Sequence, residues 1–86
     1  MHELGMCQGV LAAVERRAQG RPVARVGVQV GTQLGVAPEA FQQNFELVAA
    51  GGVAAEATTH LTMVGGDELL LEWIEYREPL PAETKA

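Results

Sequence analysis

The apolar positions of this chain of 86 residues change their spacing from one segment to the next. Over residues 4–18 they recur at steps of three and four, which predicts an amphipathic helix. Its buried stripe would hold Leu4, Cys7, Leu11, Val14 and Ala18. Gly20, with Pro22 just beyond it, is expected to end this helix. Around Val26, Val28 and Val30 the spacing falls to two, the pattern of a half-buried strand.

A second helix is predicted to begin at Pro38, with Glu39 in a first turn where the helix dipole favours a carboxylate. Its apolar stripe would be Phe41, Phe45 and Val48, with Leu47 flanking it, and Gly51-Gly52 would end it.

Two further strands follow, over residues 58–64 and 67–76. Leu61 and Met63 are expected to point inward from the first of them. Gly65-Gly66 suits a two-residue hairpin between the two strands. In the last strand the apolar residues change phase at Glu72-Trp73, which predicts a β-bulge.

The resulting order α-β-α-β-β predicts an α+β fold with a three-stranded mixed sheet and two helices on one face. A right-handed crossover would make the first two strands parallel, and the hairpin would add an antiparallel pair. We expect residues 1–77 to form a single domain and residues 78–86 a flexible tail. The pattern leaves the strand order open.

Composition narrows the range of functions. The net charge is −5 with a pI near 4.8, and Lys and Arg total only 6, so nucleic acid is not expected as a partner. The apolar runs are too short for a membrane span or a signal peptide, and we expect a cytoplasmic protein. The single cysteine excludes an internal disulfide or a Cys-x-x-Cys zinc site. No catalytic triad or phosphate loop is present, so we do not expect an enzyme.

The start of the chain, Met1-His2-Glu3, is the clearest candidate for chemistry. The amine of Met1 and the amide and imidazole nitrogens of His2 can close fused chelate rings around a small divalent cation. The amide of Glu3 or an outside ligand could complete a plane, and tetragonal sites of this kind suit Ni(II) or Cu(II). We expect Met1 to be retained because His2 is bulky. A lone histidine near an N-terminus is more often simply solvated.

Three other residues have both a functional and a structural interpretation. Cys7 could be a soft ligand, but its place in the helix stripe favours a buried thiol. His60 could be a second ligand, but its strand position favours a solvated side chain. Trp73, beside Glu68, Glu72 and Glu75, is out of phase with the core and is a candidate partner or dimer contact, although charges on an edge strand most often only prevent pairing.

Several stretches together resemble the HypA/HybF family of nickel metallochaperones. The matching stretches are Met1–Leu4, Cys7-Gln8, Arg25–Gly31, Gly35–Ala40, Phe45–Gly51, Gly65–Leu69 and Ile74-Glu75. The resemblance implies that Met1, His2 and Glu3 hold Ni(II) in a planar, nitrogen-rich site. It also implies delivery of nickel to NiFe hydrogenase and in some organisms urease, with the GTPase HypB and a hydrogenase large subunit as partners.

The chain departs from the family pattern at three places. The family inserts a zinc-binding lobe with two Cys-x-x-Cys pairs, where this chain has only Val64–Asp67, so no structural zinc is expected. Ala37 replaces a common acidic residue before Pro38, and Gly5 replaces a common serine. The main hypothesis is therefore a nickel metallochaperone whose metal site is the N-terminus alone. The alternative is a protein-interaction module without metal that docks or oligomerises through its strand edge; a homodimer is left open.

Overall fold

The two helices begin and end where the local sequence predicts. A computed structural model of the protein describes residues 3–78, in which α1 spans Glu3–Ala18 and α2 spans Pro38–Ala49. After α1 the backbone turns through Gln19 and Gly20, which have positive φ angles of 51° and 88°. After α2 it turns at Gly51, with a φ of 81°. Both helices therefore end through left-handed residues, a conformation that glycine adopts without strain.

The buried face of α1 is turned relative to the predicted stripe. Its buried residues are Met6, Cys7, Val10, Val14 and Ala18, whereas Leu4 is 42% exposed and Leu11 only partly buried. The prediction for Leu4 is therefore wrong. The reason is that α1 packs against α2 as well as β3 (Leu69–Tyr76), so its contact surface follows two neighbours.

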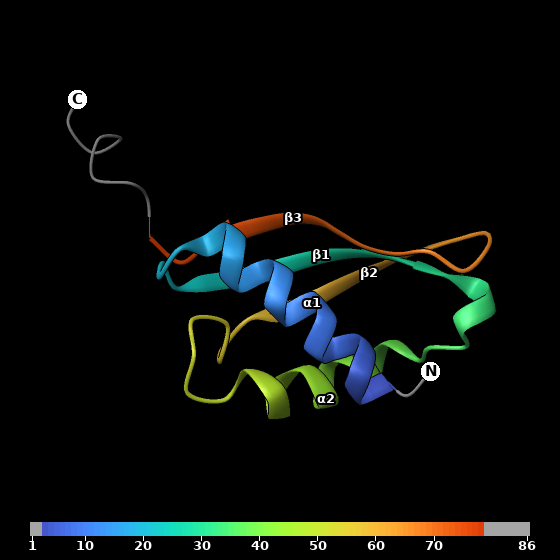
Figure 1. The fold of residues 1–86 in the computed structure, drawn as a ribbon, viewed down its shortest axis with the longest axis horizontal. Coiled ribbons are helices and arrows are strands. Elements are labelled where there is room, and N and C mark those ends of the chain that lie inside the picture. The colour runs from blue at the N-terminus through green and yellow to red at the C-terminus, as the bar shows by residue number, and fades with distance from the viewer. Residues whose placement is uncertain (1–2, 79–86) are drawn as a thin grey trace.

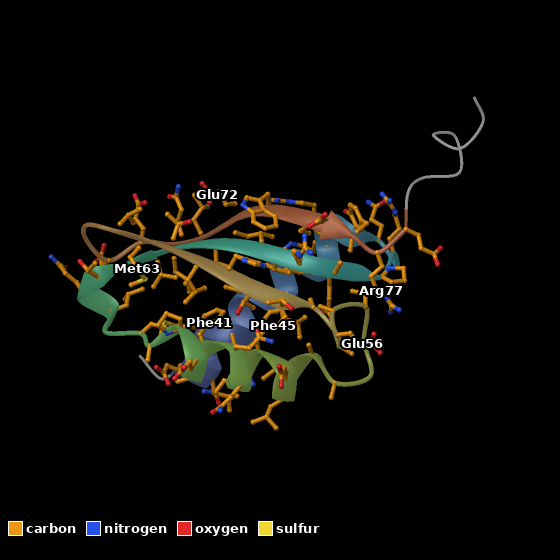
Figure 2. All side chains as sticks on the ribbon, turned by 180° about the vertical axis from the view of Figure 1, so that it is seen from behind. Phe41, Phe45, Glu56, Met63, Glu72 and Arg77 are labelled. Atoms are coloured by element: carbon orange, nitrogen blue, oxygen red, sulfur yellow. The ribbon has the colours of Figure 1, made fainter. Side chains whose placement is uncertain are left out.

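The buried face of α2 follows its two phenylalanines. Phe41, Phe45 and Ala49 are buried, Val48 is partly buried, and Leu47 is 71% exposed. Figure 2 shows Phe41 and Phe45 between α2 and the sheet. Their rings stack with centroids 6.4 Å apart. This aromatic pair fills the layer between the helix and the strands.

A three-stranded sheet forms the second layer, with both helices on one of its faces (Figure 1). The strand order is β2-β1-β3, with β1 (Val23–Gly31) between β2 (Thr58–Val64) and β3. β1 is parallel to β2 and antiparallel to β3. Val26, Val28 and Val30 are fully buried, as predicted. The α+β class, the mixed sheet and the helices on one face are all confirmed.

The predicted hairpin between β2 and β3 is wrong. β3 pairs with β1, and the connection through Gly65-Gly66 crosses the end of β1 (Figure 1). Gly31 donates its N–H to the Glu68 carbonyl at 2.7 Å, and Gln33 donates to the Gly66 carbonyl at 2.9 Å. Two glycines permit a tight turn but do not decide which strands pair. The valine-rich β1 gains most from the central position, where both its edges are covered.

The predicted bulge in β3 is confirmed. Gly27 is opposite Trp73 and Val28 is opposite Leu71, so Glu72 is the extra residue. The shift keeps Leu71 and Ile74 on the core side despite their odd spacing. The bulge therefore lets β3 bury its apolar residues on both sides of the phase change.

Gln42 of α2 holds the free edge of β2. Its side-chain oxygen accepts hydrogen bonds from the Thr59 N–H at 2.7 Å and the Thr59 hydroxyl at 2.6 Å. Its Nε2 donates to the Ala57 carbonyl at 3.3 Å. One side chain thus satisfies several polar groups where β2 begins.

No helix within residues 3–78 is long and apolar enough to cross a membrane.

Candidate metal centre

The predicted metal ligands lie at the very start of α1. Met1 and His2 are outside the described residues, and Glu3 is the first residue of the helix. The first N–H groups of an α-helix have no acceptor within the helix. The Glu3 amide nitrogen is therefore not required for the helical hydrogen bonds.

The first turns of α1 and α2 lie side by side on the helix side of the sheet (Figure 1). The Cys7 thiol donates to the Phe41 carbonyl with an Sγ–O distance of 3.4 Å. This contact joins the second turn of α1 to the first turn of α2. Glu3 is thus anchored at the end of a well-packed helix pair.

Cys7 is a buried thiol, as its place in the helix stripe predicted. Its side chain is fully buried. Burial, and secondarily the negative charge of Glu3, raise the pKa of the Cys7 thiol to about 11. Metals bind the thiolate form, so Cys7 would be a poor ligand near neutral pH.

His60 lies on the opposite face of the sheet from the helices. It is exposed on β2, as predicted, and is in register with Gly27 of β1. Its ring centroid is 5.8 Å from that of Trp73. Because the sheet separates His60 from α1, the structure does not bring His60 together with Glu3. Within residues 3–78 no group of three or more His, Cys, Asp or Glu side chains is arranged to hold a metal ion.

The sequence predicted that Trp73 is exposed, but it did not predict the contact of Trp73 with Gly27. Its exposure, 40%, confirms that it is out of phase with the core. Its indole also lies on Gly27, where any Cβ would overlap with the indole ring. The clue in the sequence was a glycine at an outward position between two valines, but only the strand register relates it to Trp73.

Comparison with known proteins identifies the family. The family model described as "Hydrogenase/urease nickel incorporation, metallochaperone, hypA" matches residues 1–68. The hydrogenase maturation factor HypA of Rhodopseudomonas palustris (strain BisB5) is 38% identical over 69 residues, which cover 77% of this chain and 61% of the relative. Hydrogenase maturation factor HypA 2 of Bradyrhizobium diazoefficiens is 39% identical with the same coverage.

A third relative, hydrogenase maturation factor HypA of Nostoc sp. (strain PCC 7120), is 26% identical over 110 residues, which cover 91% of this chain and 97% of the relative. That span exceeds the 86 residues of this chain, so the relative carries residues without a counterpart here. The chain spans about 61% of the length of the Rhodopseudomonas and Bradyrhizobium relatives. With a family match over residues 1–68 and relatives of this similarity, the chain belongs to the HypA family.

Proposed function

We propose that this protein is a nickel metallochaperone for hydrogenase maturation that binds Ni(II) through Met1, His2 and Glu3. The observation that carries the proposal is the family match, which begins at residue 1 and so includes all three residues. The relatives are named as hydrogenase maturation factors, and the family description adds urease as a second recipient.

The chemistry of these three residues suits planar nickel. The Met1 amine, the amide and imidazole of His2 and the amide of Glu3 supply four nitrogens for one plane, and Ni(II) favours such tetragonal sites. The two amides bind as anions, so their charges offset the charge of Ni(II). A neutral complex avoids repulsion by the positive end of the α1 dipole.

The expected partners are the GTPase HypB and a hydrogenase large subunit, in the cytoplasm. The protein would carry the ion and catalyse no reaction. We expect residues 1–77 to act as one domain for this purpose; the expected tail falls mostly on residues 79–86, which lie outside the described residues.

Titration of Ni(II) into untagged protein tests the proposal. We expect the visible absorption of planar nickel and tight retention of the metal on dialysis. His2→Ala should abolish both, because it removes the imidazole from the chelate. His60→Ala is the matched control, because it removes the other histidine of the chain. His60 is exposed on β2, and its loss should leave nickel binding unchanged. Equal nickel binding by the wild type and His2→Ala would refute the site.

Two further conditions should weaken binding. Residues added before Met1 convert the amine into an amide and should abolish the signal. Acidification should release the metal, because the amine, the amides and the imidazole must all lose protons to bind. Binding that persists with an N-terminal extension would show that nickel is held elsewhere.

The alternative is a protein-interaction module that carries no metal. In this hypothesis the chain docks or oligomerises through its strand edge, and the exposure of Trp73 and Leu70 on the edge strand β3, 40% and 52%, favours it. This alternative hypothesis predicts that the untagged chain does not bind nickel tightly. The nickel titration therefore separates the two hypotheses.

A further inference from the structure

The face of the sheet opposite the helices has an exposed aromatic ring at its centre. Both helices cover the other face, and Figure 2 shows Glu72 on the side away from α2. Trp73 lies across the central strand at Gly27, with His60 of β2 beside it. One side of the indole therefore rests on the backbone of Gly27, and the side chain as a whole stays 40% exposed.

The bulge places a carboxylate next to this ring. A regular strand would direct Glu72 and Trp73 to opposite faces. Here Glu72 is the extra residue, and its Oε2 accepts a 2.8 Å hydrogen bond from Nε2 of Gln29, an outward-facing residue of β1. Glu72 and Trp73 therefore share the open face.

The charge of Glu72 is not balanced by its partner. Gln29 is neutral, whereas the neighbouring Glu75 is paired with Arg25 at 2.8 Å. Within residues 3–78, the cation–π contact is between Arg21 and Tyr76, with the guanidinium 3.7 Å from the ring centroid. In the described part of the chain, the Trp73 ring and the Glu72 carboxylate thus have no lysine or arginine partner.

We propose that this open face is a docking surface for an arginine-bearing, partly apolar segment of a partner protein. A guanidinium can stack on the indole of Trp73 and donate paired hydrogen bonds to Glu72. An apolar side chain next to it would cover Leu70, which is 52% exposed. Trp and Arg are enriched in protein interfaces for these reasons. The proposal does not depend on the proposed nickel ligands, of which Glu3 lies on α1 in the helical layer.

A second copy of this chain fits the surface less well. Among the paired residues of the three strands, the open face carries two carboxylates, Glu72 and Glu75, and one guanidinium, Arg25. Arg25 already forms an ion pair with Glu75. Two such faces in contact would oppose like charges, which disfavours association.

Fluorescence of Trp73, the single tryptophan, reports directly on this surface. The probe is a capped peptide in which arginines alternate with leucines, added up to about 1 mM, the range expected of a weak interaction. We expect a saturable change in Trp73 emission. A peptide with lysine in place of arginine should bind several-fold more weakly, because an ammonium cannot stack or bond in pairs.

Glu72→Gln is the decisive variant. It should weaken binding of the arginine peptide roughly tenfold through loss of the charged hydrogen bonds. The glutamine still accepts the bond from Gln29, so the fold is preserved. Glu39→Gln makes the same charge change at an exposed position of α2, away from the open face. This variant should bind the arginine peptide like the wild type. Equal affinities of both variants, or no binding by the wild type, would overturn the proposal.

Sedimentation of the chain without peptide completes the test. We expect a monomer at concentrations where the peptide binds. If the chain forms a dimer and Leu70→Ser dissociates it, a second copy of the chain occupies this face. The proposal of an arginine-bearing partner would then be wrong.

Discussion

Individual side chains connect the layers of this fold through a few polar contacts. Gln42 reaches from α2 to Thr59 and Ala57 at the start of β2. Gly27 and Gly31 act by having no side chain, since a Cβ at either would overlap with Trp73 or with the Gly66 carbonyl. Each of these roles depends on a residue distant in sequence.

Replacement of Gln42 should destabilise the protein. Gln42→Ala leaves the Thr59 N–H and the Ala57 carbonyl without this partner, and a lost hydrogen bond of this kind costs about 1 kcal/mol. Gln43→Ala is the matched control, because Gln43 is its exposed neighbour on α2. Urea unfolding of both variants measures the difference. Equal midpoints would mean that Gln42 contributes nothing to stability.

The Cys7 thiol should make stability fall at alkaline pH. The pKa of Cys7 rises from an ordinary 9.0 to about 11 in the folded protein, because of burial and then Glu3. Between these values the unfolded state loses its thiol proton while the folded state keeps it, so the free energy of unfolding decreases as pH rises. Cys7→Ala should show a shallower decrease over the same range. An identical slope in the variant would contradict the shifted pKa.

At the scale of secondary structure, the start of α2 lacks a capping side chain, and the two edge strands differ in the features that discourage pairing with other chains. Pro38 begins α2, but Ala37 at the N-cap has no side-chain oxygen for the free N–H groups. Of the two edge strands, β3 carries Glu72 and a bulge, both of which discourage pairing with other chains. β2 has only His60 as an ionisable residue.

An aspartate at the N-cap should stabilise α2. In Ala37→Asp the carboxylate can accept a hydrogen bond from the first turn and interact with the helix dipole, which together are worth about 1 kcal/mol. Ala37 is exposed, so the change needs no repacking. Ala37→Val occupies the same position without an oxygen and should give no gain. Thermal unfolding compares the three proteins, and an equal gain for valine would exclude capping as the cause.

At the scale of the whole molecule, the path of the chain depends on one crossing. The connection from β2 to β3 passes over the end of β1, where Gly31 donates to the Glu68 carbonyl. This crossing puts β2 and β3 at opposite edges and leaves the central position to β1.

A side chain at Gly31 should therefore cost stability. Gly31→Ala places a methyl group where the Gly66 carbonyl lies, and forced displacement of this sort costs roughly 1–3 kcal/mol. Gly65→Ala, in the same connection, points into open space and should change stability by less than about 0.5 kcal/mol. Denaturant unfolding of both variants measures the difference. An unchanged stability of Gly31→Ala would show that the crossing is loosely packed.

The sequence by itself determined the elements, because the signals for them are local. Periodicity, Pro38 and the glycines after each helix predicted both helices, the three strands and the bulge at Glu72. The same pattern predicted that Cys7 is buried and that His60 and Trp73 face outward. For the N-terminal site the sequence named Met1, His2 and Glu3, which remain a prediction.

Only the tertiary structure decided which strands pair, which side of α1 is buried and what surrounds Trp73. Gly65-Gly66 is compatible with a hairpin or a crossing, and the burial of β1 by two neighbours selects the crossing. The stripe of α1 is wide enough for two orientations, and the presence of α2 selects one. The pairing of Trp73 with Gly27 depends on strand register. These features arise from contacts between distant segments, so no local pattern encodes them.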